Sequence, residues 1–366
     1  MSDRTIRRQG QVLRSARRNV GLPFKDIVTP RELPWGALSG RAVAVDAYNA
    51  LYQFLATIRQ ADGQPFSDAD GLPTSHLMGS FYRTTSLLAA GVRPVWVFDG
   101  KPPERKAGTI RQRIEAKERA TEQWRAALAV GDLATARRKA AQTSRLTPPM
   151  VEETIELLDA LGVPTVRAPS EGEAQAARMA ADGVVWATAS EDYDTLLFGA
   201  PRLVRGLAAR RSGRTGGTDA AQLIDREEML RLLDISGDEL ILIGILVGTD
   251  FNDGVRGYGP KKALKIVQEH LGWAETIART GLDPTEADEV AEIFRHPNTT
   301  PAPPLDFRPP DPDRVARVLV RRHGFSEERV RSALQRVGRA PTQAKPVPTT
   351  PRGRQQSLDR FEEVPS

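Results

Sequence analysis

The chain has 366 residues, 40% of them hydrophobic, which is enough to bury a core in one large domain or two modest ones. It has no cysteine and only four histidines, so disulfides and cysteine nucleophiles are excluded and carboxylates are the main ligands left for any metal. The net charge is +5, no apolar run approaches the roughly 20 residues of a bilayer-spanning helix, and no signal segment opens the chain, so we expect a cytoplasmic protein with no membrane partner.

Short apolar runs of strand type alternate with helical patterns in the first half of the chain. In chain order, strands are expected at 41–46, 92–99, 163–166 and 184–189, and helices at 48–59, 151–161 and from Ser170 onward. This alternation predicts an α/β fold with a mainly parallel central sheet flanked by helices. Ligands bind such sheets beyond the carboxyl ends of the strands.

The segment 104–145 is alanine-rich, basic and helical in pattern, with a break at Gly131 and Asp132. It has few large apolar residues to bury, so we expect it to project from the body of the protein. Positive charge is concentrated here, with twelve Lys or Arg against five acids in 101–145. Such a stripe either binds a polyanion or is an ordinary solvated helix face.

The second half of the chain is mostly helical. We expect amphipathic helix over 225–247 and further helices after Thr280, interrupted by a proline-rich stretch at 297–312. Other basic stripes carry five arginines without an acid in 201–218 and eight arginines against two acids in 314–339. Beyond Arg339 the composition predicts a disordered tail.

Acidic residues cluster where the predicted elements end. So many carboxylates at one sheet edge would repel each other unless a cation compensates them. Oxygen ligands are the preference of Mg²⁺ or Mn²⁺, and two such ions would suit phosphodiester hydrolysis. The candidate ligands are Asp46, Asp99, Glu171, Glu173, Asp192, Asp194 and Asp250.

Each of these acids also has a structural interpretation. Ser170 and Glu173 fit a helix capping box, in which each side chain bonds the backbone of the other residue. Asp194 fits a helix cap, and Asp46 fits a turn residue at a strand end. The repeated placement of acids at strand ends of one sheet favours the metal site.

A glycine-rich turn followed by a basic helix start lies in 248–267. Gly257 and Gly259 flank a tyrosine, and lysines follow at Lys261, Lys262 and Lys265. Backbone N–H groups of such a turn can bind a phosphate, so the segment resembles a helix-hairpin-helix that binds duplex DNA without reading its sequence. The alternative is an ordinary turn between two helices, with glycine for positive φ.

Several long strings resemble one family, the archaeal-type flap endonucleases of lagging-strand processing and long-patch repair. They include AVDAYNALYQFL, VFDGKPP, APSEGEAQAA, DYDTLLFGAPRLVR and ILVGTDFNDGVRGYGPKKAL. The resemblance runs from Gly21 to about Val267 and weakly to Arg339. It implies a PIN-like nuclease core, one nuclease domain at 21–340, and a helical arch at 104–145 that a single-stranded 5′ flap passes through.

The resemblance also implies roles for single residues. One divalent ion would lie among Asp46, Asp99, Glu171 and Glu173, and the second among Asp192, Asp194 and Asp250. Lys106 and Arg113 match the arch residues that act on the scissile phosphate, and Tyr52 matches an aromatic residue on which a base stacks. The hairpin at Gly257 and Gly259, with Lys261, Lys262 and Lys265, would hold duplex DNA, in the family with help from K⁺.

The C-terminal tail 341–366 contains a peptide at 355–362 similar to the one by which these nucleases bind the sliding clamp. Gln355, Leu358 and Phe361 fit that peptide, with the two apolar side chains entering a pocket on the clamp. Glu362 stands where the second of two paired aromatics is usual.

Residues 1–20 carry six arginines against one acid and precede Gly21, which matches a glycine close to the active site in the family. This segment is either a basic arm that adds nonspecific DNA contacts or the product of a misplaced start, with translation beginning at Val20. We favour the misplaced start, because an arm there would crowd the path of the flap.

Together these features predict a monomeric, nucleoid-associated 5′ flap endonuclease, with 5′–3′ exonuclease activity, that acts on flap or branched DNA. Two other functions are also consistent with these features. A related nuclease would prefer junctions, bubbles or 5′ ends, and a noncatalytic DNA-binding partner of the clamp would lack acids at the strand ends. None of those acids is missing here.

Overall fold

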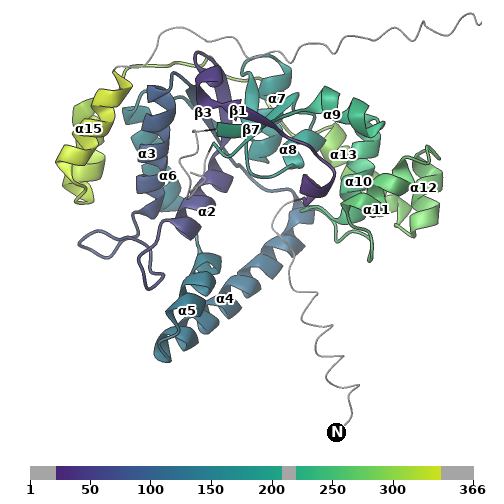
Figure 1. Cartoon of the computed structure of the whole chain (residues 1–366), viewed down its shortest axis with the longest axis horizontal. Helices are drawn as coiled ribbons and strands as arrows, with labels where there is room; N and C mark the ends of the chain where they lie inside the picture. The colour runs from purple at the N-terminus through teal and green to yellow at the C-terminus, as the bar shows by residue number, and fades with distance from the viewer. Residues whose placement is uncertain (1–21, 208–219, 339–366) are drawn as a thin grey trace, which may run out of the picture.

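The apolar runs form the middle of a seven-stranded sheet in the computed structural model, which describes residues 22–207 and 220–338 (Figure 1). Its strands are β1 (Arg31–Pro34), β2 (Ala42–Asp46), β3 (Arg93–Phe98), β4 (Thr165–Arg167), β5 (Ala187–Ala189), β6 (Arg202–Arg205) and β7 (Ala220–Asp225). They are ordered β1-β7-β6-β5-β2-β3-β4, and the five from β6 to β4 run parallel. The predicted α/β class is confirmed.

Helices cover both faces of the sheet because alternate side chains of its strands are apolar on both sides. Val43 and Val45 of β2 join the core cluster under α2 (Ala47–Thr57), α3 (Ser75–Ala89) and α6 (Pro148–Ala160). Ala44, between them, faces the other cluster, to which α7 (Gly172–Ala181) contributes Met179.

A second lobe is built from helices around its own apolar cluster. Its helices are α8 (Asp194–Leu197), α9 (Arg226–Leu233), α10 (Gly237–Val247), α11 (Pro260–Val267), α12 (Trp273–Thr280) and α13 (Pro284–Arg295). The helical structure expected over 225–247 is present as two helices, α9 and α10. Asp234 ends α9 in the left-handed conformation with φ 52°, and Ser236 with Glu239 forms a capping box that starts α10.

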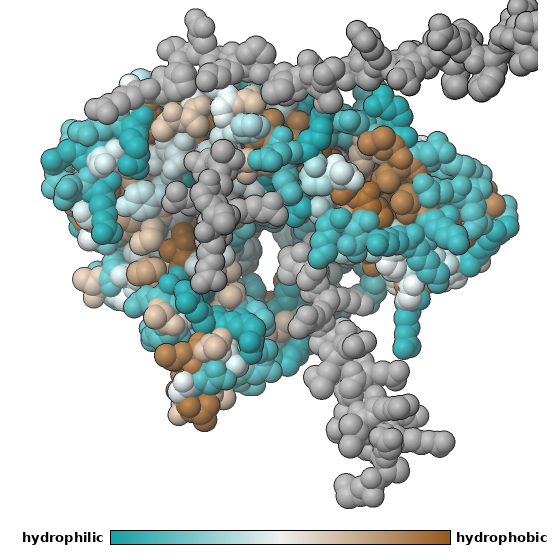
Figure 2. Space-filling model, in the orientation of Figure 1, coloured by the Kyte–Doolittle hydropathy of each residue, from teal (hydrophilic) through white to brown (hydrophobic). Residues whose placement is uncertain are grey.

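The basic segment forms a two-helix arch, α4 (Ala107–Ala129) and α5 (Leu133–Ala140), which projects from the body (Figure 1). The predicted break is confirmed: Gly131 has φ 72°, and the side chain of Asp132 accepts the N–H of Thr135 at 2.9 Å. The space-filling view shows an opening between the arch and the body (Figure 2). The arch follows the short 3₁₀ turn Glu104–Lys106; other such turns are Phe24–Asp26, Trp35–Leu38 and Ala141–Thr143.

The proline-rich stretch crosses the molecule without helix or strand from 297 to 311, where the side chain of Gln175 binds the backbone of Thr300. It leads to α14 (Pro312–Ala316), a π-helical turn (Arg317–Arg322) and α15 (Glu327–Val337), which packs on α3. None of the helices in 22–207 and 220–338 is long and apolar enough to cross a membrane.

Candidate active site

The predicted acids lie at the carboxyl edge of the parallel strands, as the order of the strands requires. Asp46 is the last residue of β2, Asp99 directly follows β3, and Asp192 lies in the loop after β5. Because β5, β2 and β3 are neighbours, their ends bring these carboxylates together from distant parts of the chain.

Ser190, which the sequence analysis did not single out, joins three of these acids. Its hydroxyl donates to Asp46 at 3.1 Å or to Glu173 at 3.2 Å, and it accepts the backbone N–H of Asp192 at 3.1 Å. A lone serine after a strand carries no signal of such a role, so only the fold reveals it.

The proposed capping box at Ser170 is wrong. The cap residue of α7 is Glu171, no side chain caps that end of the helix, and Glu173 points to Ser190 instead. Asp194 is the first residue of α8 rather than its cap, which is Tyr193. Asp46 does cap α2, through the N–H of Asn49 at 3.0 Å.

The carboxylates are buried close to one another, and this perturbs their ionisation. Burial raises the pKa of Asp46 to about 6 and that of Asp99 to about 7, and neighbouring acids add to both rises. Burial followed by repulsion from other carboxylates also raises the pKa of Glu173 and Asp194 well above their usual values. The site therefore lacks positive charge for the number of acids it contains.

A divalent cation fits this donor set. Asp194 is only 5% exposed, and its Oδ1 has no hydrogen-bond partner among the described residues. An orphaned carboxylate oxygen surrounded by other carboxylates is what an oxygen-ligated Mg²⁺ would satisfy. In the described ranges no three acidic or histidine side chains stand in metal-holding geometry, and cations from the arch lie beside two of the acids, Glu171 and Asp250.

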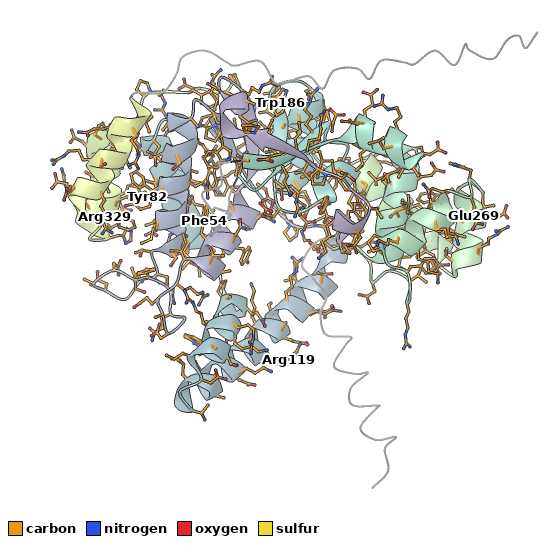
Figure 3. All side chains as sticks on the ribbon, viewed as in Figure 1. Phe54, Tyr82, Arg119, Trp186, Glu269 and Arg329 are labelled. Carbon is orange, nitrogen blue, oxygen red and sulfur yellow. The ribbon has the colours of Figure 1, made fainter. Side chains whose placement is uncertain are left out.

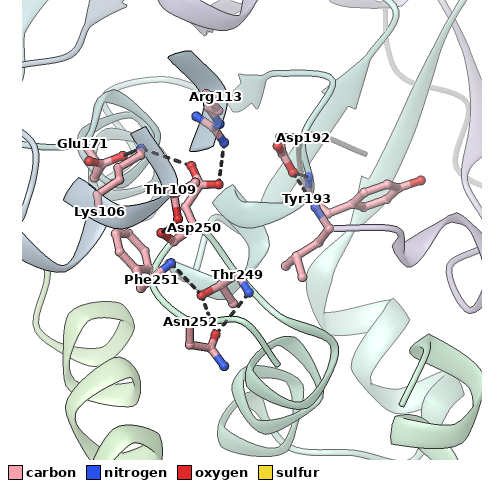
Figure 4. Close-up of polar contacts among 11 residues, drawn as sticks. Lys106, Thr109, Arg113, Glu171, Asp192, Tyr193, Thr249, Asp250, Phe251 and Asn252 are labelled. Carbon is pink, nitrogen blue, oxygen red and sulfur yellow. Dashed lines mark hydrogen bonds and ion pairs between the residues drawn. The ribbon is translucent and has the colours of Figure 1, made fainter. Parts of the chain in front are cut away.

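Two arch residues supply those cations (Figure 4). The ammonium of Lys106 bonds Glu171 and lies 3.3 Å from Oδ2 of Asp250, while Arg113 donates to Oδ1 of Asp250 at 2.5 Å. Although burial opposes it, the two carboxylates raise the pKa of Lys106. The arch base is therefore fastened to the acidic site by charge.

The loop that carries Asp250 is held by its own polar contacts (Figure 4). The amide oxygen of Asn252 accepts from the backbone N–H of Thr249 at 3.1 Å and from its hydroxyl at 2.8 Å, and the Asn252 amide donates to the carbonyl of Ile245 at 2.8 Å. Thr109 of α4 donates to the carbonyl oxygen of Asp250 at 2.9 Å. Sequence reasoning missed Thr109 and Asn252, which lie within conspicuous motifs but carry no charge.

Tyr52 lies on α2, and its side chain is 37% exposed. The ammonium of Lys117 stands 4.5 Å from the centre of that ring. The arch side chains are largely directed to solvent, and Arg119 on α4 is labelled in Figure 3.

The predicted hairpin between α10 and α11 is present as a turn with accessible lysines. Gly257 has φ 86°, and Gly259 caps α11 in an extended conformation. Lys261, Lys262 and Lys265 are exposed, and the ammonium of Lys262 lies 4.0 Å from the centre of the Tyr258 ring.

The described chain starts beside the acids, where the backbone N–H of Leu22 donates to Asp192 at 3.1 Å. Gly21 and the preceding segment lie outside the described residues. So do Gln355, Leu358 and Phe361 of the proposed clamp peptide.

Two family models match the chain: the XPG N-terminal domain over residues 24–120 and the XPG I-region over residues 162–250. Flap endonuclease 1 of Aeropyrum pernix is 46% identical over 354 residues, which cover 93% of this chain and 99% of the relative. The chain belongs to the flap endonuclease family. Flap endonuclease 1 of Pyrococcus abyssi is similarly 44% identical and covers 88% of the chain and 95% of the relative.

A solved structure supports the same fold for this flap endonuclease. Flap endonuclease-1 from Methanococcus jannaschii is 40% identical, with a TM-score of 0.70 over 87% of this chain and 98% of that one. The catalytic core of Rad2 in complex with DNA, at 24% identity and a TM-score of 0.66, shares the fold alone.

Proposed function

We propose that this flap endonuclease hydrolyses a phosphodiester bond at the base of a 5′ flap and leaves a nick for ligase in replication and repair. The observation that carries the proposal is the gathering of buried carboxylates, from segments far apart in sequence, directly under the base of a basic arch. Full-length relatives named flap endonuclease 1 support the choice of substrate.

Two divalent cations would be held by the carboxylates in the sets already named, Asp46 with Asp99, Glu171 and Glu173, and Asp192 with Asp194 and Asp250. Mg²⁺ is the expected ion, with Mn²⁺ as an alternative, because all the donors are oxygens. When bound, such ions lower the pKa of the attacking water and neutralise charge on the phosphate.

The chain's own residues would position and stabilise the DNA around that reaction. Lys106 and Arg113 would move from the carboxylates to the scissile phosphate and offset the charge that develops in the transition state. Tyr52 would stack on a base next to the cut, and the single-stranded flap would pass through the arch.

The hairpin would hold duplex DNA away from the cut. Its backbone N–H groups and Lys261, Lys262 and Lys265 suit phosphates and read no sequence. A K⁺ ion bound to the turn of Gly257 and Gly259 is part of the proposal.

A cleavage assay tests this function. We expect cleavage of a 5′-flap substrate in Mg²⁺, weaker cutting of nicked, bubble and four-way substrates, and none in EDTA. Asp99→Ala should abolish cleavage while flap binding survives, and Asp70→Ala, an exposed loop acid, is the matched control. Preferential cutting of four-way junctions, or normal cutting by Asp99→Ala, would overturn the proposal.

The proposed monomer would reach its substrates in the nucleoid through the sliding clamp, by Gln355, Leu358 and Phe361. The double change Leu358→Ala and Phe361→Ala should abolish clamp binding and clamp stimulation of cleavage, with clamp-free cleavage unchanged. Replacing Glu362 by Phe should strengthen binding, because it restores the second apolar anchor. Equal clamp binding by all three proteins would remove the clamp from the proposal.

A further inference from the structure

One face of the arch base makes three different contacts with a single residue of the second lobe, Asp250. Lys106, Thr109 and Arg113 follow each other at spacings of three and four, so they lie on the same side of the helix. Lys106 and Arg113 each take one carboxylate oxygen of Asp250, and Thr109 takes its backbone carbonyl (Figure 4).

These contacts differ in what a divalent cation would do to them. The two ion pairs occupy carboxylate oxygens that are also the proposed metal donors, and Lys106 takes Glu171 as well. A cation with two charges attracts those oxygens more strongly than an ammonium does, and it repels the ammonium. The hydroxyl of Thr109 is neutral and bonds a carbonyl oxygen, so the same cation leaves it in place.

The arch is held at its base by few other interactions. Arg105 pairs with Glu289 of α13, and the ammonium of Lys106 lies 5.9 Å from the centre of the Phe251 ring. Farther along the same helix α4, Trp124 donates to the carbonyl of Asp62 at 3.3 Å, and the ammonium of Lys117 lies over the Tyr52 ring. Release of Lys106 and Arg113 would therefore free the base of α4 around Thr109, while Trp124 still holds the distal part of the helix.

We propose that the arch base is a latch opened by divalent metal: Lys106 and Arg113 hold Asp250 and Glu171 in the metal-free protein, metal displaces them, and Thr109 is the pivot that keeps the arch attached. This inference rests on the metal site in the proposed function. The displaced side chains of Lys106 and Arg113 then become available to bind phosphate only when metal occupies the site.

Metal affinity without DNA tests the competition, by electron paramagnetic resonance of free Mn²⁺ during titration. Lys106→Gln should bind Mn²⁺ more tightly than wild type, by roughly tenfold. Lys101→Gln is the control: it removes the same charge from an exposed lysine whose ammonium makes no ion pair with the described residues. Thr109→Val should bind Mn²⁺ as wild type does.

The outcomes separate the latch from the proposed function. Wild type that binds no Mn²⁺ would overturn the metal site and with it both proposals. Wild type that binds Mn²⁺ with the same affinity as Lys106→Gln, or equal tightening by Lys101→Gln and Lys106→Gln, would overturn the latch alone.

Movement of the arch gives an independent readout. The chain has no cysteine, so spin labels attach only where cysteines are introduced, at Val130 on the arch tip and Leu232 on α9, which are 80% and 71% exposed. We expect the distance distribution between the labels to broaden when Mg²⁺ is added, and to be broad without metal in Lys106→Gln. A distribution that Mg²⁺ leaves unchanged in wild type would contradict the latch.

Discussion

At the scale of one residue, the burial of Asp194 lowers the stability of the folded protein and provides a proposed metal ligand. It is buried with an unpaired oxygen, and burial together with the neighbouring acids Asp192 and Asp250 raises its pKa. The proposed metal site explains why the fold keeps a carboxyl group at a position where ionisation is unfavourable, because metal binding needs the charged carboxylate.

Asp194→Asn should therefore separate the two properties. We expect no detectable cleavage, because a proposed metal ligand is lost, and a free energy of unfolding that rises by about 1 kcal/mol in EDTA at pH 8, because a repelling charge is removed. Thermal melts and flap assays measure the two effects. Asp70→Asn should change neither, and a destabilised Asp194→Asn would contradict the account.

At the scale of elements, the ends of β3 and β4 must approach closely to bring Asp99 beside α7. Gly100 makes this possible: its backbone N–H donates to the carbonyl of Ser170 at 2.7 Å. A Cβ atom at Gly100 would lie 2.1 Å from the carbonyl oxygen of Ala168, which is too close for any side chain.

Gly100→Ala should push the two loops apart and displace Asp99. We expect a loss of about 2 kcal/mol or more in stability and a fall in cleavage, measured by denaturant unfolding and by the flap assay. Gly108→Ala is the matched control, because Gly108 lies in α4 with open space at its Cβ position and alanine favours helix by about 0.5–1 kcal/mol. If Gly100→Ala and Gly108→Ala have the same free energy of unfolding, the short distance between position 100 and the carbonyl of Ala168 does not explain the glycine at position 100.

At the scale of the whole molecule, a buried polar cluster joins the C-terminal segment to the body. His323 bonds Asp68 at 2.8 Å, with side chains 2% and 4% exposed, and both His323 and His76 approach Glu153. The bond to His323 lowers the pKa of Asp68. Burial lowers the pKa of His76 from 6.5 to about 4.

The contribution of His76 to stability should therefore fall on acidification, whereas the raised pKa values of the active-site carboxylates act in the opposite direction. Between pH 6.5 and about 4 the unfolded chain binds a proton at His76 that the folded protein does not, so up to about 1.4 kcal/mol is lost for each pH unit in that window. The lowered pKa of Asp68 acts in the same direction at lower pH. His76→Gln should remove this contribution, so on acidification from pH 6.5 to 4 its free energy of unfolding, measured with denaturant, should rise relative to that of wild type, and His296→Gln, at an exposed position, should show no such change.

The sequence by itself predicted the α/β fold, the projecting helical arch and the acidic residues that gather at the carboxyl edge of the sheet. The two apolar runs that end at Asp46 and Asp99 predict buried parallel strands with negative charge at one edge of the sheet. Gly131 and Asp132 predict the break in the arch. These are local consequences of burial, periodicity and backbone conformation, so they can be read along the chain. The prediction of a flap DNA substrate came from the long stretches of sequence that resemble the flap endonucleases.

Only the tertiary structure decided which contacts the acids make. It assigned Glu173 to Ser190 instead of a helix cap, and it brought Thr109 of the arch to the carbonyl of Asp250. Antiparallel β1 and β7 at the sheet edge were also beyond local pattern, since pairing joins residues as far apart as Arg31 and Leu223. Such contacts depend on where distant segments meet in the fold. Uncharged residues such as Ser190 and Thr109 produce no recognisable pattern of composition or spacing in the sequence.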